Sequence, residues 1–574
     1  MGKIWQVLPP ISNDFIDLHS EYDRIFLQLL FNRGLKEKRE IEEFLNSDFK
    51  TIPEPFLFKD MGSAVDLIIE HIKKQSKILV YGDYDADGVT SSALLVEILR
   101  ILKAPVDVYI PDRVSEGYGL NKKAIEEFAK NNIKLIITVD GGIRDKDEIN
   151  FTKEKGLDVI VTDHHVAPEK EDLPECLIIN PNVKDETYPS KNLAGVGVAY
   201  KLAIAIIAKA KLPEEAKEKL REQILDLVAV GTVADCVSLL GENRVLVKEG
   251  LKILNKTKRI GLQKLIKKAQ ISGKLESWNI GFQLGPRLNA AGRMEHANTA
   301  FGLLITKDEQ EAESLAEKLN EKNIDRQRIT EEIMAEIEKQ ISSEKKEEDY
   351  IIIGICPLRK EDESEVWNEG VIGLVAGKLC DKYYRPVLVI TEAEDGYKGS
   401  GRSIEEFNIV AAVEEAKEFL EKYGGHPAAC GFSIASSSLE KFTAKMREVA
   451  ARELAQINLQ PKLKIEAELD LNKIGDELQG NIEKFLPFGQ DNPQPRFLTK
   501  NAQIKDIMNM GVDGQHVKFR FNGFWAIAFG RSEEWKEFKI GDKVDIVYYI
   551  ERNEFNGRSE VQMKLVDIKL TINN

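Results

Sequence analysis

The sequence is poor in the residues that build disulfide frameworks and zinc sites. It has only five cysteines and seven histidines in 574 residues, and no two cysteines form a C-x-x-C pair. A small disulfide-stapled secreted protein and a zinc ribbon are therefore both excluded. Any metal site has to be built mainly from carboxylates.

Long apolar runs and an amino-terminal targeting signal are also missing. No stretch approaches the roughly 18 apolar residues of a membrane span, and MGKIWQVLPP at the start lacks the basic and apolar segments of a signal peptide. We therefore expect a cytoplasmic protein without membrane attachment. The net charge of −15 argues against a protein that coats nucleic acid by charge alone, but it leaves room for a local basic groove.

From about residue 60, short apolar segments alternate with stretches of helical periodicity. Strands are expected at KILVYGD, PVDVYI, KLIITVD and DVIVTD, which begin at residues 77, 105, 134 and 158, with helices near 88–102, 121–131 and 143–155. This alternation predicts a parallel sheet with helices on both faces. Ligands of such sheets bind at the carboxyl ends of the strands.

Three aspartates crowd the end of the first of these strands. VYGDYDADG places Asp83, Asp85 and Asp87 at every second position. An EF-hand loop begins in the same way, but it needs a glutamate at its twelfth position, where this chain has Leu94, and a helix in front instead of a strand. An EF-hand is excluded, and the triplet lies on a strand-to-helix turn.

Further metal ligands are expected at the same edge of the sheet. Asp140 follows one strand in VDGG, His164 and His165 follow another in TDHH, and Asp235 is expected as the one interior acid of an apolar helix. Carboxylates packed so closely repel each other unless cations lie between them. So many carboxylates with imidazoles predict two divalent ions sharing a bridging ligand, Mn²⁺ in preference to Mg²⁺.

Composition divides the chain into five expected parts. A long charged periodic stretch predicts a connecting helix, and short alternating strands near the end predict a small β-barrel. In that barrel Lys518 and Arg520 alternate with Phe519 and Phe521, so only one of these pairs faces the core. The parts are an amino-terminal extension (1–55), a catalytic α/β domain (56–303), the connecting helix (304–345), a second α/β domain (346–455) and the barrel (456–574).

Phosphate-binding side chains are expected from two motifs of the second domain and one of the first. In GSGRS, two glycines shortly before Arg402 and Ser403 allow the backbone to approach an anion closely. His426 stands in GGHPAACGF, and Arg287 in GPRLNAAGRM. The guanidinium groups suit phosphate oxygens, although either arginine could instead form a structural ion pair.

These motifs resemble the DHH phosphoesterase superfamily and, within it, the branch of single-stranded-DNA-specific exonucleases. The resemblance runs from about residue 55 to 574 and rests on GDYDADG, VDGG, TDHH, GTVADCVSL, GPRLNAAGRM, GSGRS and GGHPAACGF in that order. It implies a DHH domain, a DHHA1 domain and an OB-type tail. It also implies one metal held by Asp83, Asp85 and Asp140, a second held by Asp87, Asp140, His164 and Asp235, and His165 near the scissile phosphate.

The expected function is a 5′ to 3′ exonuclease of DNA repair and recombination. It would hydrolyse phosphodiesters of single-stranded DNA by a two-metal mechanism, with Asp140, His165 and Arg287 as catalytic residues, and release 5′-mononucleotides. The resemblance also implies a single-strand-binding protein and a recombination helicase as partners. Two alternatives are a phosphodiesterase for short oligonucleotides or cyclic dinucleotides, which has little use for the barrel, and a non-catalytic DNA-binding scaffold, which should have lost metal ligands.

Overall fold

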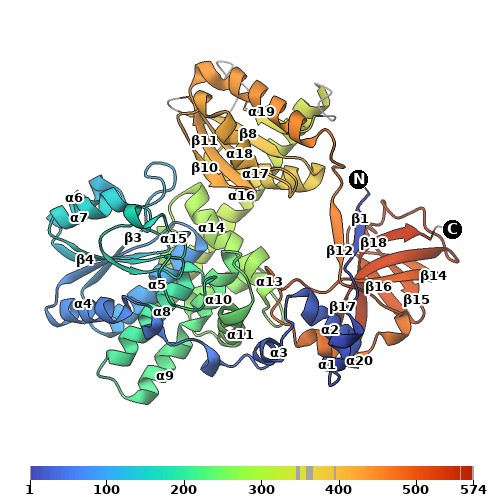
Figure 1. Ribbon diagram of the computed structural model, residues 1–574, viewed down its shortest axis with the longest axis horizontal. Coiled ribbons are helices and arrows are strands. Elements are labelled where there is room, and N and C mark those ends of the chain that lie inside the picture. Colours follow the sequence, from blue (N-terminus) through green and yellow to red (C-terminus); the bar gives the residue numbers. More distant parts are fainter. Residues whose placement is uncertain (1, 344–348, 357–365, 394–395, 556–557, 572–574) are drawn as a thin grey trace.

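The computed structural model describes residues 2–343, 349–356, 366–393, 396–555 and 558–571. Figure 1 shows the first α/β domain at the lower left, the second α/β domain above it, and the barrel on the right. In the part of the chain that the structure describes, no helix has the length and apolar character needed to cross a membrane.

The first domain contains a five-stranded sheet in which every neighbouring pair is parallel. Four strands lie where the sequence predicts them, and the fifth, a three-residue strand at the edge, was not predicted. The strands, in spatial order, are β3 (Val106–Tyr109), β2 (Lys77–Tyr81), β4 (Ile133–Val139), β5 (Asp158–Thr162) and β6 (Leu177–Ile179).

Helices cover both faces of this sheet because strand residues alternate between two cores. Ile78 and Val80 pack into one core with α4, α5, α8 and α10, while Leu79 and Tyr81 pack into the other with α6 and α7. The helices of the domain are α4 (Met61–Lys73), α5 (Ala86–Ile101), α6 (Lys122–Lys130), α7 (Lys146–Glu154), α8 (Gly195–Lys209), α9 (Glu214–Gln223), α10 (Leu225–Ala234), α11 (Gly241–Leu254), α12 (Ile260–Lys268), α13 (Ser277–Asn279), the π-helix η4 (Ile280–Leu284), α14 (Gly285–Met294) and α15 (Asn298–Ile305).

The expected position of Asp235 inside a helix is wrong. Helix α10 ends at Ala234, Asp235 is its C-cap, and Cys236 adopts a left-handed backbone conformation with φ of 60°. The interior acid of α10 is instead Asp226, which is buried and pairs with Arg259 at 3.3 Å. The turn after α10 frees the Asp235 side chain from the helix and lets it reach the end of the sheet.

The connecting helix α16 (Glu309–Ser343) has 35 residues and leads to the second α/β domain. That domain has a mixed five-stranded sheet in the order β10–β11–β9–β8–β7, in which only β7 and β8 are parallel. Its elements are β7 (Ile352–Ile355), α17 (Glu369–Tyr383), β8 (Val387–Ala393), β9 (Gly396–Arg402), α18 (Ile409–Glu415), β10 (Lys422–His426), β11 (Ala429–Ile434) and α19 (Leu439–Leu454).

The carboxyl-terminal domain is a closed five-stranded barrel, as an OB fold requires. Its strands follow the order β14–β15–β16–β18–β17, and β17 pairs back with β14. Phe519 and Phe521 are fully buried, so the aromatic face of β15 is the core face. The elements are β12 (Lys462–Ile465), β13 (Ala467–Glu468), α20 (Asp476–Glu483), β14 (Phe497–Met510), β15 (His516–Phe521), β16 (Phe524–Ala528), β17 (Lys543–Phe555) and β18 (Arg558–Leu570).

The amino-terminal residues pack against this barrel, far away in the sequence. Phe26 and Phe44 belong to the same buried cluster as Phe485 of the barrel domain, and Arg33 pairs with the buried Glu466 at 2.8 Å. The elements are β1 (Ile4–Val7), which pairs in parallel with β12, and the helices α1 (Asn13–Leu18), α2 (Arg24–Asn32) and α3 (Lys38–Leu45).

Candidate metal centre and phosphate-binding cleft

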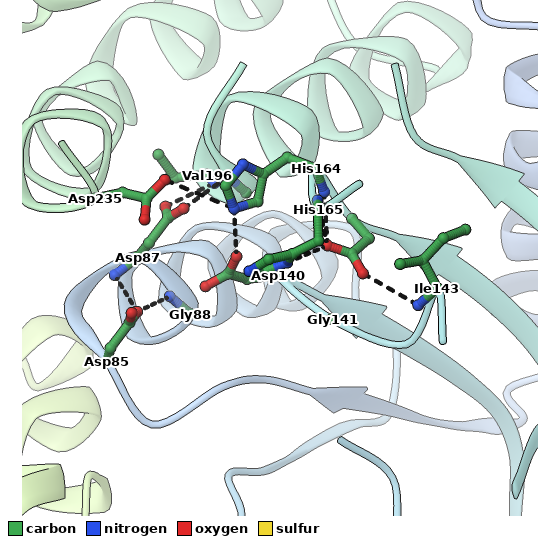
Figure 2. Close-up of polar contacts among 12 residues, drawn as sticks. Asp85, Asp87, Gly88, Asp140, Gly141, Ile143, His164, His165, Val196 and Asp235 are labelled. Atoms are coloured by element: carbon green, nitrogen blue, oxygen red, sulfur yellow. Dashed lines mark hydrogen bonds and ion pairs between the residues drawn. The ribbon is translucent and has the colours of Figure 1, made fainter. Parts of the chain in front are cut away.

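The predicted metal ligands meet at the carboxyl end of the first sheet. Figure 2 shows five of them, namely Asp85, Asp87, Asp140, His164 and Asp235. Asp83 comes two residues after the end of β2, Asp140 directly follows β4, and His164 comes two residues after the end of β5. The order in which strands are added to the sheet reverses between β2 and β4. Strand β3 is added on one side of β2, whereas β4, β5 and β6 are added on the other side. The site therefore lies at the switch point, where the loops of neighbouring strands diverge.

Asp85 and Asp87 are held by backbone amides at the starts of two helices. Asp85 is the N-cap of α5, and its carboxylate accepts hydrogen bonds from the amides of Asp87 at 2.8 Å and Gly88 at 3.1 Å. The Asp87 carboxylate accepts from the amides of Gly195 at 2.7 Å and Val196 at 2.8 Å, in the first turn of α8. Helix amino termini favour negative charge, so both carboxylates are fixed in direction before any ion arrives.

Close packing around Asp140 requires a glycine beside it. Asp140 has a left-handed backbone with φ of 60°, which directs its side chain toward the start of α8. A Cβ atom at Gly195 would lie 2.6 Å from Oδ1 of Asp140. Any larger residue at 195 would therefore push this carboxylate out of place.

Three overlapping groups of side chains can each place ligand atoms within 4.8 Å of one another. Asp140 and His164 each belong to two of them, so the groups form one continuous cluster. The groups are Asp83, Asp85 and Asp140; Asp87, His164 and Asp235; and Asp140, His164 and His165.

Several ligand atoms of this cluster are buried without a hydrogen-bond partner among the described residues. They include Oδ1 of Asp83, Oδ1 of Asp140, Nε2 of His164 and Oδ2 of Asp235. His164 Nε2 lies 3.2 Å from Asp140 Oδ1 and 3.6 Å from Asp235 Oδ2. Buried polar atoms are normally satisfied, so these atoms converge on a missing partner that accepts electron pairs. Divalent cations fit this donor set.

The pKa values in the cluster also indicate a site for cations. Burial, followed by the charge of Asp85, raises the pKa of Asp83 to about 8 and that of Asp87 to about 7. Burial and then Asp87 raise the pKa of Asp235 to about 9. Burial and the neighbouring His165 lower the pKa of His164 to about 4, which keeps its imidazole neutral and able to bind a metal. Cations in the cluster would reverse the carboxylate shifts.

Asp163 orients His165, a role that the sequence did not reveal. The fully buried Asp163 carboxylate lies 2.7 Å from Nδ1 of His165 and accepts from the amides of His164 and Ile143 at 2.7 and 3.1 Å. Burial opposes the protonation of His165, but the hydrogen bond and charge of Asp163 raise its pKa overall. Tyr118 also contacts His165 Nδ1, at 3.2 Å. An acid directly before two histidines was the only signal in the sequence.

A cleft of about 560 Å³ lies between the two α/β domains, and several of its lining side chains are basic. Tyr118 also lines it and contacts the metal centre, at the Asp140 carbonyl at 3.3 Å and at His165 Nδ1 at 3.2 Å. Arg113 and Arg293 face it from the first domain, and Arg402, Lys398 and Lys422 from the second. Among the described residues, none of the three arginines has a carboxylate partner, and the Arg402 guanidinium bonds to the Gly401 carbonyl at 2.8 Å and the Ser400 hydroxyl at 3.3 Å. Lys398 pairs with Glu369 at 2.7 Å, so it is the three arginines that suit a phosphate.

The other predicted phosphate ligands lie at different places. The Ser403 hydroxyl donates to the Phe407 carbonyl at 2.7 Å, and Ser400 lines the cleft instead. His426 is exposed on β10 and aligns through Ala429 with Arg402, so it shares a sheet face with Arg402 without lining this cleft.

Arg287 lies further along α14, where it contacts α16. Its Nε donates to the Asn320 side chain at 3.1 Å and its guanidinium to the Gln283 carbonyl at 2.8 Å. It has no carboxylate partner in the described part of the chain and lies outside the residues that line the cleft. The sequence missed Arg113 and Arg293, because only the fold brings them opposite Arg402.

Three family comparisons cover most of the chain. Residues 77–232 match the DHH family N-terminal domain, residues 350–452 the DHHA1 domain, and residues 465–567 the RecJ OB domain. The matched segments coincide with the first sheet, the second sheet and the barrel.

Whole-chain relatives have the same domain order. A single-stranded-DNA-specific exonuclease RecJ from Haemophilus influenzae is 33% identical over 97% of each chain, and one from Bacillus subtilis is 37% identical over 94% of this chain and 67% of its own length. The crystal structure of RecJ in complex with Mn²⁺ from Thermus thermophilus superimposes with a TM-score of 0.82 at 28% identity, covering 99% of this chain and 80% of that one. A second structure of that RecJ contains Mg²⁺.

Proposed function

Because the chain belongs to the RecJ family of single-stranded-DNA-specific exonucleases, we propose that it degrades single-stranded DNA from the 5′ end and releases 5′-mononucleotides. The observation that carries this proposal is that a cluster of metal ligands adjoins a cleft lined by Arg402 of the second domain. Tyr118 lines that cleft and also contacts the cluster, at the Asp140 carbonyl and at Nδ1 of His165.

The proposed ligands of one ion are Asp83, Asp85 and Asp140, and those of the other are Asp87, Asp140, His164 and Asp235. Their support is the grouping of their ligand atoms and the unpartnered buried oxygens described above. When bound, two divalent ions supply an activated water and stabilise the charge that develops on the leaving oxygen. Mn²⁺ and Mg²⁺ both suit carboxylates with a single imidazole.

His165 is proposed to hold a proton beside the scissile phosphate. Asp163 occupies Nδ1, so Nε2 is the nitrogen left for a phosphate oxygen. The raised pKa of His165 favours the protonated ring, which donates a charge-assisted hydrogen bond. Arg287 is proposed to contact a phosphate further along the strand.

Arg402 is proposed to bind the terminal 5′ phosphate, with Arg113 and Arg293 opposite it. A phosphate held there would leave the next phosphodiester over the metal ligands. Ser403 and His426 are proposed to complete this pocket. Ser403 would support the backbone after Arg402, and His426 would supply an imidazole beside the cleft on the sheet face of Arg402. The proposal extends to a cytoplasmic location, to repair and recombination, and to a single-strand-binding protein and a recombination helicase as partners, for which family membership is the only support.

The test uses one labelled sequence in three forms: a long single strand, the same strand in a blunt duplex, and a dinucleotide. With Mn²⁺, the long single strand should be shortened from its 5′ end, with mononucleotides as the first products, while the duplex stays intact. Faster hydrolysis of the dinucleotide than of the long strand would favour the alternative of a phosphodiesterase for short substrates. Shortening from the 3′ end would contradict the proposed direction.

A further inference from the structure

Two aromatic rings lie stacked and open to solvent at the start of the helical segment that leads to the metal centre. Trp278 is 57% exposed and Phe282 is 69% exposed. Their ring centroids are 5.4 Å apart and the ring planes differ by 23°. Large exposed apolar groups that adjoin each other mark interaction sites, and a flat pair suits a flat ligand.

The backbone under these rings is firmly held. Ile280 and Leu284 are fully buried, and the π-helix η4 lies between them. The Ser277 hydroxyl donates to the carbonyl of Phe488 in the barrel domain at 2.5 Å. The rings therefore stand on a fixed support at the junction of the first domain and the barrel, where α13 appears in Figure 1.

The other end of this helical segment reaches the metal-binding loop. Asn289 accepts a hydrogen bond from the Ala86 amide at 2.7 Å, and a Cβ atom at Gly292 would lie only 2.4 Å from the Tyr84 carbonyl oxygen. Arg293 lines the cleft. At a rise of about 1.5 Å per residue, the segment from Trp278 to Arg293 spans about 22 Å.

Basic side chains without acidic partners lie between the two ends. Neither Arg287 nor Arg326 has a carboxylate partner among the described residues, and Nε of Arg326 is buried without any hydrogen bond. After burial, the charge of Arg287 is what lowers the pKa of Arg326, and Arg113 and Arg326 lower that of Arg293. These guanidinium groups therefore lie close enough to repel one another, and a bound anion would relieve that repulsion.

We infer that Trp278 and Phe282 form a stacking platform for bases of the DNA strand on the 3′ side of the scissile phosphate. The inference rests on the proposed function, since it places the strand that the metal centre cuts. Aromatic faces bind bases of any sequence, and the unpaired arginines suit the phosphates between the platform and the cleft.

The length of the segment sets the reach of the platform. About 22 Å corresponds to about six nucleotides at a stacked spacing of 3.4 Å, and to fewer in an extended strand. A trinucleotide would fill the cleft without reaching the rings. A 20-nucleotide strand would contact both.

The test compares hydrolysis of a 5′-phosphorylated trinucleotide and of a 20-nucleotide strand, both with Mn²⁺. Trp278→Ala/Phe282→Ala should raise KM for the 20-nucleotide strand by about fivefold or more, the lower bound for losing one stacked base, with kcat and trinucleotide hydrolysis unchanged. Trp278→Phe should retain most of the affinity. Phe56→Ala, which removes an exposed ring of the same domain, is the matched control and should behave as the wild type.

Strands with single abasic sites identify the contact as base stacking. In the wild type, an abasic site between the third and seventh nucleotides should raise KM, and in the double variant it should have no further effect. An unchanged KM for the double variant on the 20-nucleotide strand would overturn the platform, as would equal losses on both substrates. If the wild type failed to degrade single-stranded DNA at all, the proposed function itself would fall.

Discussion

Asp140 stands at the overlap of the ligand groups, in a left-handed turn and against a glycine that leaves no room for movement. Its neighbours Asp83 and Asp235 reach the cluster from different elements, so no single secondary structure positions the site. The carboxylates could share this space in their charged form only if cations neutralised them. Single substitutions should therefore affect both metal binding and stability.

Replacing Asp140 by alanine should lower the rate of single-strand hydrolysis by at least about 100-fold, because both proposed ion sites lose a ligand. Affinity for a long strand should change little, since the barrel and the arginines remain. Asp107→Ala, at an exposed carboxylate of β3, serves as the control. Rates within a few-fold of the wild type in Asp140→Ala with saturating Mn²⁺ would contradict the bridging role.

The metal-free protein should become less stable as pH rises from about 5 to 9. In the unfolded chain the aspartate carboxyl groups have a pKa near 4. In the folded protein, burial raises the pKa to about 8 for Asp83 and about 9 for Asp235. The folded state then binds more protons, so its stability is full below the unfolded pKa and is lost as pH rises through the folded values.

Thermal unfolding in a chelator at several pH values measures this effect. Asp83→Asn/Asp235→Asn should flatten the decline, and Mn²⁺ should raise the wild-type Tm more at pH 8 than at pH 6. A parallel decline in the variant and the wild type would show that other groups cause it.

Residues at strand ends were predictable because the rule for parallel sheets depends only on strand order. Asp83, Asp140 and His164 follow from it directly. The buried carboxylate of Asp163 was visible in the motif but not its hydrogen bond to His165, which depends on how the loop turns. The sequence could not predict that Arg293 and Arg402 line the same cleft, because the two residues lie on different domains.

Residues of strand β9 alternate between half-buried and buried positions. Lys398, Ser400 and Arg402 line the cleft, while Gly399, which also borders it, and Gly401 are buried. Phe432 packs so closely that a Cβ atom at Gly399 would lie 2.1 Å from its ring. Both glycines therefore leave room for buried side chains to pack against β9. The sequence had suggested a different reason for them, the close approach of the backbone to an anion.

Arg402→Ala should reduce the preference for a 5′-phosphorylated strand over its 5′-hydroxyl twin by about tenfold or more, the cost of losing a charged hydrogen bond. Mn²⁺ affinity should be unchanged. Arg402→Lys keeps the charge but not the planar fork and should recover part of the preference. Competition between the two strands in one reaction gives the ratio directly, and equal losses on both strands would remove Arg402 from the proposed 5′-phosphate site.

Element boundaries were less predictable than element types. The helix expected to enclose Asp235 ends one residue before it, because the chain turns through a left-handed Cys236. Nothing in an apolar run marks that turn. Strand β6 was missed since three apolar residues at a sheet edge carry too little periodicity to identify.

The amino-terminal residues and the barrel form one packed body, although they lie at opposite ends of the chain. Phe26, Phe44 and Phe485 share one cluster, and the Arg244 guanidinium links it to the first domain by donating to the Phe485 and Lys484 carbonyls at 2.7 Å. The sequence predicts an amino-terminal extension at residues 1–55, but neither its individual helices nor its distant partner.

Removal of the barrel alone should therefore destabilise the rest of the protein. A fragment of residues 1–455 leaves Phe26 and Phe44 exposed to water and should aggregate, whereas residues 49–455 should fold and hydrolyse short oligonucleotides. The shorter fragment should bind a long strand more weakly and with a shallower salt dependence than the full chain. Unchanged affinity for the long strand would assign the barrel another role.

We propose that one cluster of carboxylates and imidazole holds two catalytic ions. Equilibrium binding of Mn²⁺ to the whole protein, counted alongside the hydrolysis rate on the same samples, tests this proposal. Two ions per chain should bind, activity should rise with occupancy of the second, and Asp140→Ala should bind fewer than two and be inactive. Full activity with one ion bound, or two ions retained by inactive Asp140→Ala with unchanged affinity, would contradict it.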